Sequence, residues 1–103
     1  MKKILALLVA VAATSAAFAS PEEGAKLYAE KTCVACHGKE GRKPLMPAYP
    51  KLTGQNAAYA EQQMKDIKSG ARNNGQTAAM QGVMHLVNDA EIKSLAEYLA
   101  SLK

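Results

Sequence analysis

The feature that most constrains this chain is a pair of cysteines three positions apart, with a histidine directly after the second. Cys33, Cys36 and His37 form this Cys-x-x-Cys-His pattern. On a helical turn the two thiols share one face, so both sulfurs can reach one flat partner. The pattern is that of a c-type haem attachment site. We expect two thioether bonds to the vinyl groups of one haem, with His37 offering an imidazole nitrogen to the iron.

Three other interpretations of the same residues are open. A disulfide between Cys33 and Cys36 suits an exported protein. A thioredoxin-like dithiol requires a preceding strand in a βαβ pattern, and the neighbouring sequence shows no strand-like alternation. A zinc site would add His85 to these ligands, but it lacks the second closely spaced ligand pair of structural zinc sites. The haem interpretation is therefore preferred.

The beginning of the chain has the order of a secretory signal peptide. A positive end is followed by an apolar run over residues 4–13 and by the small-residue sequence Ala-Phe-Ala. This order predicts cleavage between Ala19 and Ser20. The apolar run is shorter than the about 20 residues of a membrane span. An uncleaved N-terminal anchor is the alternative.

Cleavage divides the chain into a signal peptide, residues 1–19, and one domain, residues 20–103. We expect this domain to lie in the periplasm and not to span the membrane. The signal takes two lysines, so the formal net charge of +4 overstates the basicity of the working protein. No basic stripe interleaved with aromatic residues is present, so no nucleic-acid partner is expected. A domain this small often needs a cross-link or a bound group to be stable, because its hydrophobic core is small. A covalently held haem would enlarge that core.

The mature sequence predicts an all-α protein. Helical patterns cover residues 20–32, 56–69 and 87–103, and residues 77–87 carry methionines at helical spacing. The last helix has the clearest start, because Asn88 and Glu91 stand in the order of a capping box. Between the helices, residues 38–55 hold prolines and glycines that neither a helix nor a central strand tolerates.

A low-spin electron carrier needs a second strong axial ligand opposite the histidine, and a thioether serves this purpose. Met80 and Met84 are four positions apart, so one would face the iron while the other packs. His85 would instead give a bis-histidine site. Met64 stands at helical spacing and is expected in the core.

Two further residues are candidates for supporting the cofactor. Pro47, with Pro44 as the alternative, is expected to offer its backbone carbonyl to the second ring nitrogen of His37. Such a bond fixes the imidazole plane and strengthens the ligand. Arg72 either pairs with a haem propionate through charge-assisted hydrogen bonds or is a solvated surface residue.

The sequence resembles the class I c-type cytochromes, and more closely the cytochrome c4 subgroup with its single-domain c553-like relatives. The closer likeness is carried by residues 47–55, residues 63–70, Arg72 and Asn74. It covers essentially the whole mature chain. It implies the class I cytochrome c fold, with about four short helices wrapped round one covalently bound haem.

This resemblance also implies particular contacts. In the subgroup the ligating methionine stands twelve residues before the first large apolar residue of the last helix, which favours Met80 over Met84. The first and last helices are expected to cross beside the haem. Many cytochrome c4 proteins carry two such domains, whereas this chain has one attachment site, so two-haem behaviour is not expected.

The crossing would explain a glycine in the first predicted helix. Gly24 costs about 1 kcal/mol relative to alanine there, so we expect a packing reason, with a frayed first turn as the alternative. The resemblance implies that Gly24 and Tyr28 meet Leu95 and Tyr98.

We therefore expect an electron carrier and not an enzyme, with one haem c cycling between ferrous and ferric iron. Its partners would be periplasmic or membrane-bound redox proteins, such as an oxidase, a reductase or a dehydrogenase. Positive side chains would attract these partners to the protein, or they would serve solubility alone. The candidates are Lys39, Lys43 and Lys51. The alternatives are a haem enzyme or small-ligand sensor with an open iron site, and a haem-free dithiol module.

Overall fold

The structure is a computed structural model that describes residues 19–103, so the expected signal peptide lies outside the described residues except for Ala19. In chain order the elements are α1 (Pro21–Glu30), α2 (Cys33–His37), the 3-10 turn η2 (Lys39–Gly41), α3 (Ala57–Ser69), α4 (Thr77–Met84) and α5 (Asp89–Ser101). No strand occurs in this range, which confirms the all-α prediction. The attachment motif forms a short helix of its own in addition to the predicted ones.

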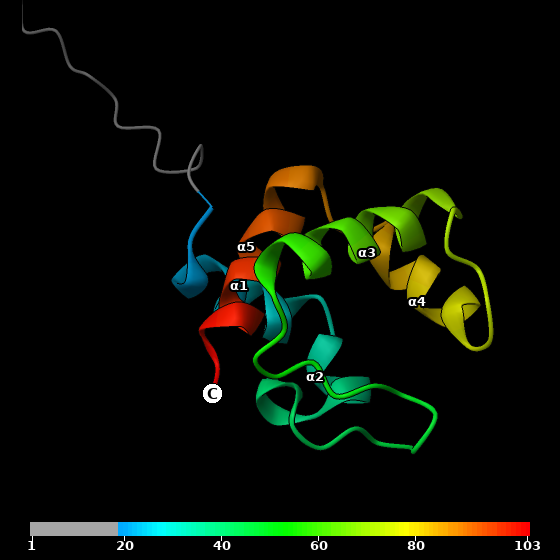
Figure 1. The fold of residues 1–103 in the computed structure, drawn as a ribbon, viewed down its shortest axis with the longest axis horizontal. Helices are drawn as coiled ribbons and strands as arrows, with labels where there is room; N and C mark the ends of the chain where they lie inside the picture. The colour runs from blue at the N-terminus through cyan, green and yellow to red at the C-terminus, as the bar shows by residue number, and fades with distance from the viewer. Residues whose placement is uncertain (1–18) are drawn as a thin grey trace, which may run out of the picture.

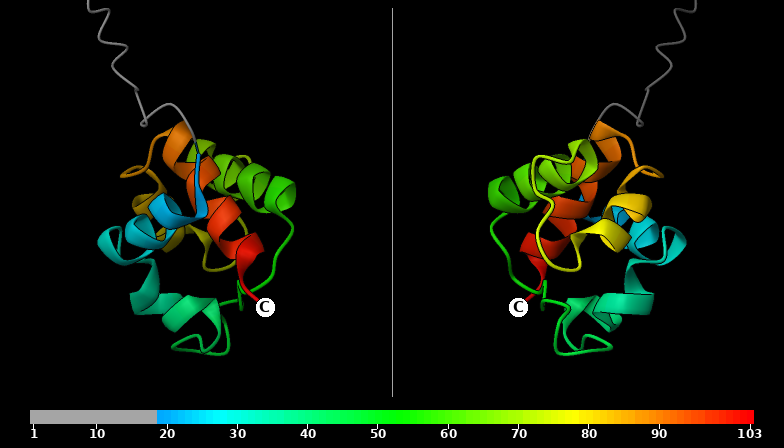
Figure 2. Two further views of the ribbon diagram at one scale, coloured as in Figure 1. Left: turned by 90° about the vertical axis from the view of Figure 1, so that its left-hand side faces the viewer. Right: turned by 90° about the vertical axis from the view of Figure 1, so that its right-hand side faces the viewer.

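Helices α1 and α5 make the most extensive contact in the fold, and Figures 1 and 2 show them lying against each other. Gly24 is buried where they meet. A β-carbon built on Gly24 would lie 2.1 Å from the carbonyl oxygen of Ser94 and 2.6 Å from Cβ of Tyr98. The expected close crossing is therefore confirmed, and it explains a residue of poor helix propensity at this position.

The start of α5 has the capping box that its sequence predicts. The side chain of Asn88 accepts from the backbone N–H of Glu91, and the side chain of Glu91 accepts from the backbone N–H of Asn88. On either side of the cap, Val87 and Ile92 are buried at the positions of a hydrophobic staple. These local contacts begin α5 at Asp89, inside the predicted range.

Apolar residues from α1, α3, α4 and α5 form one core. Its buried members are Leu27, Tyr28, Ala60, Met64, Ile67, Met84, Val87, Ile92, Leu95, Ala96 and Leu99. Tyr59, in the first turn of α3, is 52% exposed. The buried positions of α3 begin at Ala60 and follow at intervals of four and three residues, so the buried stripe passes beside Tyr59.

The residues between α2 and α3 form an irregular loop at one side of the helical body, green in Figure 1. Among residues 19–103, no helix is long and apolar enough to cross a membrane. The loop and the short helix α2 carry most of the candidate site.

Candidate functional site

The two cysteines lie on the single turn of α2, which is bounded by unusual backbone conformations. Thr32 before the helix has φ 66° and Gly38 after it has φ 79°. Both thiols are free and half-buried, so the alternative disulfide is not formed. No group of three or more His, Cys, Asp or Glu side chains in the described range is arranged to hold a metal ion. His85 in particular is exposed, and the zinc interpretation is wrong for this fold.

The environment of Cys33 suits a neutral sulfur. Its side chain borders the hydrophobic core, and burial raises the pKa of the thiol to about 11. A thiolate, the form that binds zinc, is therefore disfavoured there. A thioether carries no charge in either oxidation state of a bound haem, so the donor chemistry of Cys33 fits covalent haem attachment.

His37 is held by one ring nitrogen. It is 7% exposed, and its Nδ1 lies 2.9 Å from the backbone carbonyl oxygen of Pro50. A carbonyl only accepts, so Nδ1 carries the proton and donates, which leaves Nε2 with a free lone pair. This is the arrangement in which a histidine is oriented as a metal ligand.

The acceptor is Pro50 and not Pro47, so the sequence-based choice was wrong, as was its alternative Pro44. Pro47 lies in a turn closed by the hydrogen bond from Tyr49 N to Met46 O, which keeps it at the exposed tip of the loop. The chain returns to the histidine only at Pro50. The sequence contains several prolines in this loop, and no local signal ranks them.

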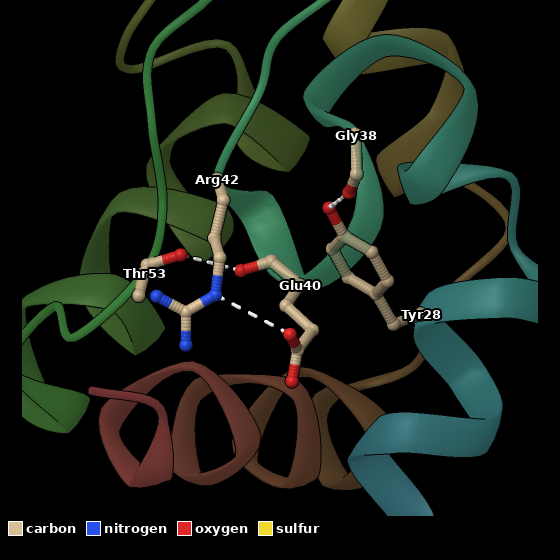
Figure 3. A network of polar contacts seen from close by, with 5 residues as sticks. All are labelled: Tyr28, Gly38, Glu40, Arg42 and Thr53. Atoms are coloured by element: carbon tan, nitrogen blue, oxygen red, sulfur yellow. Dashed lines mark hydrogen bonds and ion pairs between the residues drawn. The ribbon is translucent and has the colours of Figure 1, made fainter.

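The loop is tied back to α2 and η2 by three contacts. The backbone N–H of Leu45 donates to Cys36 O at 2.8 Å, and that of Leu52 donates to Gly41 O at 2.9 Å. The hydroxyl of Thr53 donates to Glu40 O at 2.5 Å, as Figure 3 shows. These bonds fix the path of the chain on both sides of Pro50.

A hollow of about 570 Å³ opens in the same loop. It is lined by Pro44, Met46, Pro47, Tyr49, Pro50 and Lys51. The ring of Tyr49 also faces the buried histidine, with its centroid 6.4 Å from that of His37. Two residues of this mostly apolar lining, Tyr49 and Pro50, therefore contact His37, while the lining itself includes neither cysteine nor Met80.

The two candidate methionines have different environments. Met84 is 1% exposed and is one of the most deeply buried side chains. Met80, one turn earlier on α4, is half-buried and borders the core. The side chain of Met84 is therefore fixed inside the core, whereas that of Met80 is only partly covered by it. Met64 is buried, as expected.

Arg72 lies at the surface. Its guanidinium donates to the side-chain oxygen of Gln63 on α3 at 3.2 Å, and its backbone N–H donates to Asp66 O. The solvated position was one of its two expected roles, and this contact holds the side chain along α3.

Residues 21–103 match the family model described as Cytochrome c. The all-helical fold, the Cys-x-x-Cys-His turn and the oriented histidine agree with this match, and the chain belongs to the cytochrome c family. It is accordingly an electron-transfer protein with covalently bound haem c, as its sequence predicted.

Individual relatives of the chain are cytochromes as well. The chain is 43% identical over 70 residues to cytochrome c-554(548) of Halomonas halodenitrificans, covering 68% of this chain and 83% of the relative. It is 35% identical over 102 residues to cytochrome c4 of Pseudomonas aeruginosa, covering 99% of this chain and 49% of the relative. A crystal structure of reduced cytochrome c4 from Pseudomonas stutzeri matches with TM-score 0.70 and 32% identity, over 84% of this chain and 52% of that one.

The chain thus spans about half the length of the cytochrome c4 proteins that it matches. The predicted resemblance to one half of such a protein, and the class I cytochrome c fold, are confirmed.

Proposed function

We propose that this protein is a periplasmic electron carrier in which Cys33 and Cys36 attach one haem, His37 and Met80 are the axial ligands, and no substrate is transformed. When bound, the haem supplies a one-electron ferrous–ferric couple. The observation that carries the proposal is the hydrogen bond between His37 Nδ1 and Pro50 O at 2.9 Å. It leaves Nε2 as a preoriented ligand on the residue that directly follows the second cysteine.

Met80 is proposed as the second ligand because of the contrast within α4. Met84 fills the core at 1% exposure, whereas the side chain of Met80 is only half-buried. A thioether sulfur binds iron without gaining or losing a proton and raises the potential relative to a second imidazole. Two side-chain ligands leave no open position for a substrate, which supports a carrier over an enzyme or a small-ligand sensor.

The proposed partners are periplasmic or membrane-bound redox proteins with acidic docking surfaces. Lys39, Lys43 and Lys51 are all exposed, and they lie on or next to the loop that holds Pro50. Positive side chains near a redox centre attract acidic surfaces and raise association rates, and salt screens the effect.

Arg72 is proposed to support the cofactor. Its guanidinium would pair with a haem propionate after releasing the side-chain oxygen of Gln63.

The test is an optical and redox titration of the exported, haem-loaded protein, compared with Met80→Leu and Met84→Leu. We expect a low-spin ferric spectrum with a weak long-wavelength charge-transfer band in the unmodified protein and in Met84→Leu. The band should be lost in Met80→Leu, because only that variant removes the sulfur ligand. Loss of the band in Met84→Leu alone would reverse the ligand assignment. A high-spin ferric spectrum and rapid carbon monoxide binding in the unmodified protein would replace the carrier with an open-site enzyme or sensor.

A further inference from the structure

Tyr28 connects the core of the protein to the residue after the proposed iron ligand. Its side chain is 4% exposed at the contact of α1 with α5. Its hydroxyl donates to the carbonyl oxygen of Gly38 at 2.5 Å, as Figure 3 shows. Gly38 directly follows His37, so the hydroxyl acts one peptide away from the histidine.

The peptide unit at Gly38 has little freedom. Gly38 has φ 79°, and a β-carbon there would lie 2.1 Å from Lys43 O. Its N–H donates to Val34 O at 3.0 Å. Its carbonyl accepts from Gly41 N at 3.0 Å in addition to the hydroxyl of Tyr28. The hydroxyl therefore completes the set of bonds that holds this turn.

The turn is linked in the same way to the acceptor of the histidine. The carbonyl of Gly41 accepts from Leu52 N at 2.9 Å, and a β-carbon on Gly41 would lie 2.9 Å from Cβ of Leu52. Leu52 is two residues after Pro50, whose carbonyl meets His37 Nδ1. Contacts therefore run without a gap from the phenol, through the turn, to the carbonyl that orients the imidazole.

We propose that Tyr28 is a positioning residue for the iron ligand, whose hydroxyl sets the geometry of the hydrogen bond between His37 and Pro50. This bond makes the imidazole a stronger donor, and a stronger donor favours ferric over ferrous iron. Tyr28 thereby lowers the midpoint potential without touching the cofactor. The inference rests on the proposed role of His37 as axial ligand.

Two features of Tyr28 allow the hydroxyl to be tested separately from the ring. Burial raises the pKa of Tyr28 to about 12, so the hydroxyl remains a donor throughout the neutral range. The ring packs against Tyr98 with centroids 5.6 Å apart, and this contact does not involve the hydroxyl. Tyr28→Phe therefore removes one hydrogen bond and keeps the packing.

The experiment uses the haem-loaded protein and compares Tyr28→Phe with Tyr98→Phe, which removes the same atom from the adjoining ring. Redox titration gives the midpoint potential, and NMR of the ferrous protein gives the solvent exchange of the ring N–H of His37. We expect Tyr28→Phe to raise the potential. We also expect the ring N–H of His37 to exchange with solvent roughly 2- to 10-fold faster in this variant, the range for weakening one neutral hydrogen bond. Tyr98→Phe should leave both quantities at their original values.

Three outcomes would overturn the inference. If Tyr28→Phe lowers only the free energy of unfolding, the residue is structural. If both variants shift the potential equally, the effect is a general loosening of the α1–α5 contact. If the unmodified protein lacks the low-spin spectrum of a histidine-ligated haem, the proposed function fails first and this inference fails with it. The unmodified protein is measured before either variant, so the two failures are distinguished.

Discussion

Gly24 of α1 and Ser94 of α5 approach so closely that a β-carbon on Gly24 would lie 2.1 Å from the Ser94 carbonyl oxygen. Ser94 is itself buried, and its hydroxyl accepts from the backbone N–H of Ser20 at 3.3 Å. The first and last helices therefore meet backbone to backbone at this point. Their contact depends on the absence of a side chain at Gly24.

Gly24→Ala should destabilise the haem-loaded protein by about 1–3 kcal/mol, the usual effect of overpacking. Helix propensity alone predicts the opposite, a gain of about 1 kcal/mol. The matched control is Ala25→Gly at the exposed neighbouring position, where propensity alone should cost about 0.5–1 kcal/mol. Denaturant unfolding measures both variants, and a Gly24→Ala protein as stable as the original would contradict the close approach.

The capping box of α5 gives a second prediction. Asn88→Ala removes the side chain that accepts from Glu91 N at 2.8 Å, and should lower the free energy of unfolding by about 0.5–2 kcal/mol. Asn73→Ala, at an exposed position of the irregular segment after α3, should stay within about 0.5 kcal/mol. Thermal unfolding distinguishes the two, and equal melting temperatures would show that the box contributes nothing.

Much of this fold could be predicted because its signals are local. Asn88 and Glu91 specify the start of α5 through residues three apart, and the spacing of Cys33, Cys36 and His37 specifies the cofactor. The reason for Gly24 could also be predicted, because an unfavourable residue in a helix requires a packing explanation. Each of these inferences uses information within about one turn of helix.

Two contacts near His37 could not be predicted, because both depend on the path of the irregular loop. Pro50 and not Pro47 meets His37 because distant contacts, such as Leu52 N to Gly41 O, decide where the loop returns. The hydroxyl of Tyr28 was missed for a similar reason. An apolar stripe places the ring in the core, but it does not indicate which carbonyl the phenol reaches.

The free energy of unfolding should fall at high pH, because the buried phenol of Tyr28 ionises there. Burial raises the pKa of its phenol from the ordinary value of 10.0 to about 12. A raised pKa in the folded state means that the fold favours the protonated phenol, so its contribution is complete below pH 10. The contribution is lost progressively as the pH rises from 10 through 12.

The measurement is the free energy of unfolding at neutral pH and at several alkaline values, for the original protein and for Tyr28→Phe. The alkaline loss should be smaller in the variant. It should not vanish, because burial also raises the pKa of Tyr98. Identical alkaline losses in the two proteins would exclude Tyr28 as their source.

We predict that the mature protein begins at Ser20. Its side chain accepts from Glu23 N at 3.1 Å and caps α1, so cleavage after Ala19 retains the cap. N-terminal sequencing of the exported protein should give Ser20 followed by Pro21. In that protein Ser20→Ala should lower the free energy of unfolding by about 0.5–2 kcal/mol. A retained Met1, or a first residue beyond Ser20, would contradict the predicted cleavage.

The last prediction concerns the glycine after the proposed iron ligand. Gly38 combines φ 79° with ψ 174°, a conformation that essentially only glycine adopts. A β-carbon there would also lie 2.1 Å from Lys43 O, a backbone atom that no side-chain rotation can move aside. Gly38→Ala should therefore suffer both backbone strain and overlap, and displace the chain at His37.

Gly70→Ala is the matched control, because Gly70 also has positive φ, at 87°, but its β-carbon would meet only the flexible end of Gln81 at 3.4 Å. Backbone strain alone should cost about 1–2 kcal/mol there. We expect a larger loss of unfolding free energy in Gly38→Ala, together with a smaller fraction of exported protein that carries haem in a low-spin state. Equal losses in the two variants would mean that the chain at Lys43 moves aside, and that the turn after His37 is less constrained than its contacts indicate.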